Sequence, residues 1–287
     1  MYGGIAVARN LLCLTYTTDR GRVFLVDVED KRPVDFWEFG DGADGYADAG
    51  GVAIDESFTI YVADTHGERV RRFTAFGKAL SSFGQPHRRA PGAVSRDRTG
   101  FLDRPHAVAE HDEVVYVACG DQHLRRGVQR FSYTGEVLSP LHAFGDPEAR
   151  FGAPRGMCAG PGGIFVADTL NGVVQRFTSA GRFVHEFATA RGVGGISRPI
   201  AVQDLGDGTV LVVDQGDQPG LYRVDLNGRV VEALSGTRGI VDAVDLARDD
   251  AGRVYVLDRD GERVQRLHPD LTPDTEVLDL AEYLHDR

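Results

Sequence analysis

The chain has 287 residues, of which 42% are hydrophobic and 26% are charged, a composition typical of a globular protein. Its formal net charge of −11 argues against a non-specific nucleic-acid binder, which needs a cationic surface, and against docking on an anionic membrane. We therefore expect no nucleic-acid partner.

The cysteines argue against a secreted disulfide framework. Cys13, Cys119 and Cys158 are odd in number and far apart in the sequence. The first residues lack the basic and apolar regions of a signal peptide, and no apolar run reaches the length of a membrane span. We expect a cytoplasmic protein with reduced thiols and no insertion into a membrane.

An internal repeat organises the sequence. The stretch 61–73, which reads Tyr-Val-Ala-Asp-Thr and ends Arg-Val-Arg-Arg-Phe, returns in related form at 165–177 and 255–267. Each copy reads as an apolar strand, an Asp, a tight polar turn and a second strand. Alignment on the first strand of each repeat gives six anchors: Ile5, Val52, Val108, Met157, Val202 and Val244. The number of residues between successive anchors is typical of one blade of a propeller.

Taken in chain order, the six units are 1–40, 46–84, 103–145, 152–188, 196–236 and 240–282. The first is degenerate, because 12–17 lacks the Val-Ala-Asp strand, and the third carries an insertion at 119–126. In the second we expect four strands: Gly51–Asp55, Thr59–Asp64, Arg69–Thr74 and Ala79–Phe83.

We predict an all-β protein with a single domain over 1–287, a six-bladed β-propeller of four-stranded antiparallel blades. The 36 glycines suit a fold of many short strands and turns. Both chain ends fall at a unit boundary. We therefore expect blade six to pack on blade one and close the ring without a clearly shared blade.

The units resemble the NHL repeat. Its opening, Pro-x-x-Val-Ala, is matched in 104–109, 153–157 and 198–202, and its close is matched in 74–84 and 178–187. The resemblance covers essentially the whole chain and implies a six-bladed propeller. It implies no single activity, because propellers carry unrelated functions.

In such a blade the start of the first strand and the turn after the second strand lie on one rim, around the mouth of the central channel. The first position gives Gly3, Gly50, His106, Arg155, Ile200 and Asp242 across the six units, and the second gives Thr17, Asp64, Cys119, Asp168, Asp214 and Asp258. The candidate ligand-binding residues of this face are His106, Arg155, Cys119, Asp242, Asp64, Asp168, Asp214 and Asp258. The alternative for the repeated Asp residues is structural, because an Asp entering a turn accepts backbone N–H bonds.

His106 is the strongest candidate for chemistry. Pro105-His106 resembles the Pro-His opening that supplies zinc-binding histidines in the peptidyl-α-hydroxyglycine α-amidating lyases, which are NHL propellers. Arg155 and Ile200 stand at the next two such positions, so a three-histidine site is not reproduced. No cofactor is certain, but zinc or calcium is a candidate, with possible ligands His66, His106, His123 and Cys119. The alternative is a His106 that hydrogen-bonds at the channel mouth.

Two functions remain open. The favoured one is a binding propeller whose channel-mouth face holds a partner protein or a small anionic ligand, with Arg155 as a bidentate clamp. The other is a metal-assisted small-molecule lyase or hydrolase, similar to the amidating lyases or to propeller lactonases. In it His106 acts as ligand or general base and Arg155 stabilises an anion. The basic connection 86–99 is either a docking loop or a solvated loop.

Overall fold

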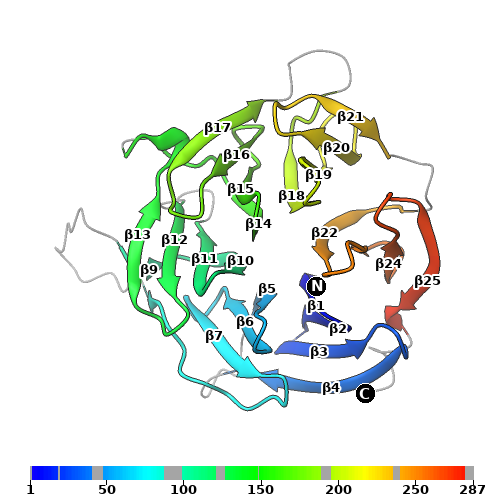
Figure 1. Cartoon of the computed structure of the whole chain (residues 1–287). Helices are drawn as coiled ribbons and strands as arrows, with labels where there is room; N and C mark the ends of the chain where they lie inside the picture. The colour runs from blue at the N-terminus through cyan, green and yellow to red at the C-terminus, as the bar shows by residue number, and fades with distance from the viewer. Residues whose placement is uncertain are drawn as a thin grey trace.

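The computed structural model describes residues 2–18, 20–40, 48–86, 99–120, 127–147, 149–188, 195–234 and 240–281. Within these residues, five four-stranded sheets and one three-stranded sheet, all antiparallel, stand around a common axis (Figure 1). The prediction of a six-bladed all-β propeller is confirmed. No helix in the described ranges combines the length and the apolar character needed to cross a membrane.

The blades follow one another in chain order, each with its first strand innermost. Blade one contains β1 (Tyr2–Ala8), β2 (Leu11–Thr17), β3 (Gly21–Asp27) and β4 (Arg32–Phe39); blade two contains β5 (Ala49–Ile54), β6 (Thr59–Asp64) and β7 (Arg69–Thr74). Blade three contains β10 (Pro105–His111), β11 (Val114–Cys119), β12 (Gly127–Ser132) and β13 (Val137–Leu141), followed by a short 3₁₀ helix at Ala143–Gly145. Blade four contains β14 (Pro154–Gly160), β15 (Gly163–Asp168), β16 (Val173–Phe177) and β17 (Phe183–Ala188). Blade five contains β18 (Pro199–Asp204), β19 (Thr209–Asp214), β20 (Gly220–Asp225) and β21 (Val230–Ala233); blade six contains β22 (Ala243–Arg248), β23 (Val254–Asp258), β24 (Arg263–Leu267) and β25 (Pro273–Asp279).

Blade two departs from the expected four strands at its outer edge. The predicted strands Thr59–Asp64 and Arg69–Thr74 are confirmed as β6 and β7. The predicted strand Ala79–Phe83 is wrong as a continuous strand, because this segment forms only the isolated bridges Phe73–Ala79 and Val70–Phe83. Beyond it, β8 (Gln85–Pro86) pairs in parallel with β9 (Phe101–Leu102). Most of the basic connection, 87–98, lies outside the described residues.

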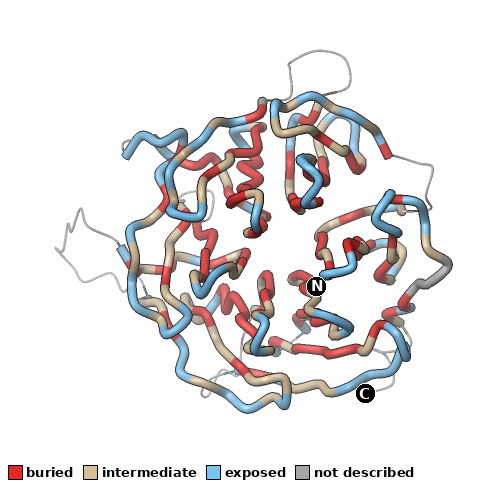
Figure 2. The backbone as a smooth tube through the Cα atoms, in the orientation of Figure 1, coloured by how far each residue is buried: buried red, intermediate tan, exposed pale blue. Residues whose placement is uncertain are grey.

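The hydrophobic cores lie between neighbouring blades, whereas the outer strands carry most of the exposed residues (Figure 2). One core joins Tyr61 and Val70 of blade two to Val108, Val115 and Phe131 of blade three. A four-stranded sheet has two faces to bury, and in a ring each neighbour covers one of them. Each blade therefore depends on both of its neighbours.

The inner strands approach one another closely enough to exclude side chains at one position. A Cβ atom added to Gly51 would lie 2.9 Å from Ala107 Cα, and one added to Gly156 would lie 2.7 Å from Ala201 Cα. Both distances are shorter than a carbon–carbon contact allows. This inner position is small in five blades, as Gly4, Gly51, Ala107, Gly156 and Ala201, and it is Asp245 in blade six.

The ring closes between blade six and blade one, without exchange of a strand. A shared core packs Leu14 and Phe24 of blade one against Tyr255 and Leu257 of blade six. The carboxylate of Asp245 crosses the same boundary and accepts a 2.9 Å hydrogen bond from the backbone N–H of Ile5. Because β1 is the edge strand of its sheet, this N–H has no strand partner on that side.

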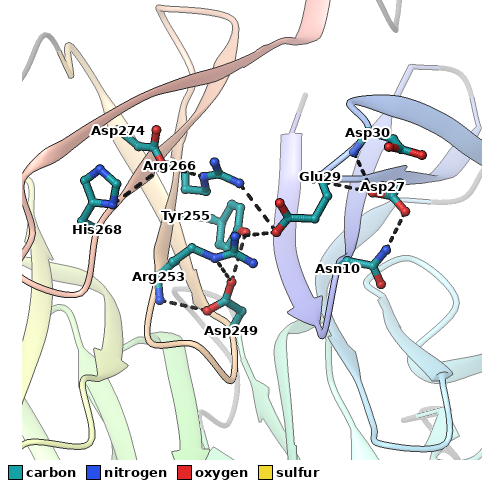
Figure 3. A network of polar contacts seen from close by, with 10 residues as sticks. All are labelled: Asn10, Asp27, Glu29, Asp30, Asp249, Arg253, Tyr255, Arg266, His268 and Asp274. Carbon is teal, nitrogen blue, oxygen red and sulfur yellow. Dashed lines mark hydrogen bonds and ion pairs between the residues drawn. The ribbon is translucent and has the colours of Figure 1, made fainter.

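A second link joins blades one and six, at the end of the ring opposite to the starts of the inner strands. Glu29, in the last turn of blade one, contacts the guanidinium of Arg253 at 2.5 Å and that of Arg266 at 4.0 Å (Figure 3). Arg253 also pairs with Asp249 at 2.6 Å. The side chain of Glu29 is 53% exposed, so solvent screens this link and we expect it to contribute modestly to stability.

The buried position of Asp245 between blades six and one shifts the pKa of its carboxyl group. Burial raises its pKa from 3.8 to about 6, although the hydrogen bonds from the N–H groups of Ile5 and Leu246 oppose the rise. The folded chain therefore binds a proton more tightly than the unfolded chain between these pH values. The stabilisation from this proton is complete below the lower pKa and is lost as pH rises through the upper one.

We predict that Asp245→Asn, compared with wild type, gains stability as the pH rises from 4 to 8. A pKa rise from 3.8 to about 6 corresponds to at most about 3 kcal/mol at high pH. Urea unfolding at several pH values measures this difference, with the exposed Asp260→Asn as the matched control. Glu110, whose pKa burial raises to about 7, also shapes the wild-type profile, so only the difference between variants is diagnostic. A difference that is constant with pH would contradict the assignment.

Candidate functional site

The start of each inner strand pairs with the end of the second strand, as the sequence predicted. The partners are Pro105 with Cys119, Pro154 with Asp168, Pro199 with Asp214, and Ala243 with Asp258. Both positions therefore lie at one end of the ring in each blade. We call this end the channel-mouth face.

A β-bulge follows the first residue of each inner strand and holds the side chains that we expected at the rim. The register shifts around His106 in blade three, Arg155 in blade four and Ile200 in blade five. In blade six the shift lies at Val244, so the placement of Asp242 at this position is wrong by two residues. Blade six lacks the proline that marks the strand start in blades three to five, and its Val-Asp-Ala-Val-Asp sequence fits both alignments.

Asp242 nevertheless lies on the same face, in the segment that leads into β22. Its carboxylate accepts a 3.1 Å hydrogen bond from the amide of Gln215 in blade five and pairs with Arg259 at 2.5 Å. It lines a cavity of 240 Å³ between blades five and six whose walls include Leu221 and Ile240. Asp242 is therefore already neutralised by a partner.

The repeated Asp residues lie beneath this face and fix the lead-in segments, by which we mean the residues just before each inner strand. Asp168 accepts the N–H groups of Gly152 and Ala153 at 2.6 and 2.9 Å. Asp214 accepts those of Ser197 and Arg198 at 3.0 and 2.6 Å, and Asp258 accepts those of Val241 and Asp242 at 3.1 and 2.9 Å. All three are at most 1% exposed. These bonds match the structural alternative, in which the Asp residues accept backbone N–H groups. A role of the three carboxylates in ligand binding stays a prediction.

Asp64 fills the same position in blade two with different partners. Its carboxylate accepts the N–H of Gly67 at 2.9 Å and pairs with Arg69 at 3.1 Å and Arg71 at 2.7 Å. In blade four, Gln175 stands in register with Arg71, and its amide donates to Asp168 at 2.8 Å. The central carboxylate is thus neutralised by arginine in blade two and by neutral donors in blade four.

Cys119 replaces the Asp in blade three. It is 3% exposed, and its thiol lies 3.6 Å from the carbonyl oxygen of Val117. Burial raises the pKa of this thiol. The environment therefore opposes a thiolate, the form that a nucleophile or a metal ligand needs.

His106 is half-buried beside this turn, and its Nε2 lies 3.2 Å from the carbonyl oxygen of Gly120. His66 is exposed in the corresponding turn of blade two. His123 lies outside the described residues. Among those that are described, no three His, Cys, Asp or Glu side chains converge on a point that could hold a metal ion. The described residues thus do not fit the zinc or calcium site, which stays a prediction.

Arg155 is exposed at the rim, and two more exposed arginines that the sequence did not suggest lie on the same face. Arg150 and Arg198 are also exposed, in the lead-in segments of blades four and five. Within the described part of the chain, these three guanidinium groups make no hydrogen bond or ion pair. We call Arg150, Arg155 and Arg198 the arginine patch.

The buried aspartates beneath the arginine patch are already used by other donors. Asp168 and Asp214 are saturated by backbone and amide donors, whereas the arginines of blades two and six pair with Asp64 and Asp258. Asp217 is the exposed carboxylate of the neighbouring turn, and among the described residues it is bound through its backbone N–H, which donates to the Ser197 hydroxyl. Three exposed arginines and one exposed carboxylate, that of Asp217, therefore share this sector of an acidic protein.

No family profile and no curated protein sequence matches the chain. Solved structures match it in fold. A streptogramin B lyase has a TM-score of 0.64 at 13% identity, over 95% of this chain and 81% of that one. A nidogen–laminin complex gives 0.64 at 14% identity, over 92% of each chain. A gluconolactonase from Xanthomonas campestris gives 0.61 at 16% identity, over 90% and 82%. At these identities the likeness establishes the propeller fold alone, and the resemblance to the NHL repeat stays a prediction.

We predict that Asp168→Ala destabilises the protein by about 2–4 kcal/mol, because it leaves buried N–H groups without an acceptor. The matched control is Asp217→Ala, whose carboxylate is exposed and which should change stability by less than about 0.5 kcal/mol. Urea unfolding at neutral pH measures both. Equal effects of the two substitutions would show that Asp168 does not fix the lead-in segment.

Proposed function

We propose that the protein is a binding propeller whose channel-mouth face holds an anionic group through Arg155, with His106 at the same position of the neighbouring blade. The observation that carries the proposal is the exposed Arg155 without a described partner. A guanidinium offers a planar fork of donors that matches a carboxylate or a phosphate. A small anionic ligand or an acidic side chain of a partner protein supplies such a carboxylate or phosphate.

The rigidity of the rim supports this assignment. Arg155 projects from the bulge of β14, whose lead-in segment is fixed by Asp168 and whose next residue, Gly156, abuts the backbone of Ile200. A side chain on such a backbone loses little conformational freedom when it binds. The nidogen–laminin complex shows that a chain of this fold occurs in a protein–protein complex.

We predict that citrate and pyrophosphate bind the full-length protein at low salt and that Arg155→Ala weakens this binding by at least about tenfold. Arg155→Lys should lie between the two, because lysine keeps the charge but not the fork. The matched control is Arg182→Ala, an exposed arginine at the opposite face. Isothermal titration calorimetry measures each affinity. Binding that is equal in Arg155→Ala and wild type would overturn the proposal.

A small-molecule lyase or hydrolase is the second candidate. The contact between His106 Nε2 and the Gly120 carbonyl orients the imidazole at the rim, as a general base requires. The streptogramin B lyase and the gluconolactonase also carry this fold. The metal-assisted form would need ligands beyond those that the described residues bring together.

If the enzyme candidate is correct, the purified protein should contain stoichiometric zinc or calcium that His106→Ala loses, or should open lactone substrates at a rate that His106→Ala lowers by at least about 100-fold. Elemental analysis and a lactone hydrolysis assay measure these outcomes. His268→Ala, which changes an exposed histidine in the turn after β24 and outside the candidate ligand set, is the matched control. A protein that fails both tests while still binding anions through Arg155 is a binding propeller.

A further inference from the structure

An apolar side chain stands beside the arginine patch. Leu170 lies in the turn after β15 and is 58% exposed. The turn is held on both sides, because the Thr169 N–H donates to Ala153 O at 3.0 Å and the Thr169 hydroxyl donates to Pro199 O at 2.7 Å. The exposure of Leu170 is therefore a property of a fixed backbone.

The arginine patch lies on both sides of this turn. On one side, the amide of Asn171 donates to the carbonyl oxygen of Arg150 at 3.3 Å. On the other side, a Cβ added to Gly172 would lie 2.9 Å from the carbonyl oxygen of Ser197, the residue before Arg198. Arg155 completes the patch from the inner strand of the same blade. The surface thus combines one exposed apolar group with three cations.

A second exposed apolar residue on the same face, Val241, shows why the sector around Leu170 is the distinctive one. Val241 is 72% exposed, but the charges next to it, Asp242 and Arg259, already pair with each other at 2.5 Å. Beside Leu170 the arginines carry no such compensation among the described residues. Charge complementarity therefore selects an anionic partner for this sector.

We infer that Leu170 and the arginine patch form a docking surface for a partner protein, through a segment in which an apolar side chain is flanked by carboxylates. This inference rests on the proposed function and names the class of its ligand. The apolar side chain covers Leu170, and the carboxylates pair with Arg150, Arg155 and Arg198. The formal net charge of −11 disfavours a uniform polyanion, because the rest of the surface repels it.

The test is a selection of short random peptides on the immobilised full-length protein, with counter-selection on Leu170→Ser. We expect the enriched peptides to combine an apolar residue with two or more acidic ones. Fluorescence anisotropy of the best peptide should show weakening of about five- to tenfold in Leu170→Ser. The double variant Arg150→Ala, Arg198→Ala should weaken it by at least about tenfold, and high salt should do the same.

Matched controls are Val184→Ser, an exposed valine on the outer strand of blade four, and Arg182→Ala, neither of which should change the affinity. All changed side chains are exposed, and thermal unfolding verifies that each variant keeps its fold. A selection that enriches no peptides, or enriches peptides without acidic residues or with equal affinity for Leu170→Ser, overturns the inference. If citrate still binds through Arg155, the proposed function survives that result. If neither probe binds, both proposals fail.

Discussion

Closure of the ring is the constraint on which the rest of the structure depends. Every blade buries its two faces against its neighbours, so an open ring would leave the first and last blades half uncovered. The chain closes it without exchanging a strand, through a core shared by β1–β3 and β22–β25 and through the contacts of Asp245 with Ile5 and of Glu29 with Arg253. Asp245 is the unusual part of this closure. It places a carboxylate where five other blades tolerate only glycine or alanine, at the single boundary that the backbone does not connect.

The close approach of the inner strands also determines which residues can project from the channel-mouth face. Inner strands that touch through backbone atoms leave no room for side chains between them, so functional groups can project only from the bulges, the lead-in segments and the turns. Buried aspartates fix these segments from below. In blades four and five they are saturated by backbone and amide donors. The exposed arginines above them therefore form no ion pair with a described residue. They give an acidic protein a sector with several cations.

The fold is shared by a streptogramin B lyase, a gluconolactonase and a chain of a nidogen–laminin complex at identities of 13–16%. At such low sequence identity, proteins with different functions share the fold, so the function depends on the residues of the rim. Here the rim offers a fixed leucine, three arginines and an oriented histidine. It offers no thiolate, because Cys119 is buried with a raised pKa. We propose that this combination serves recognition of an anionic partner.

The sequence by itself determined the propeller, its six units and the common rim, because apolar strands, turn residues and a repeated Asp recur at a spacing that only this architecture uses. It also identified His106 and Arg155 as rim residues, through the prolines that mark the strand starts. Before Val244, where that proline is missing, the sequence predicts a register that differs by two residues from the observed one, and it gives no sign of the role of Asp245. The arginine patch and Leu170 were decided by the tertiary structure alone. A sequence shows charges and apolar side chains, but only packing shows which of them have already found partners.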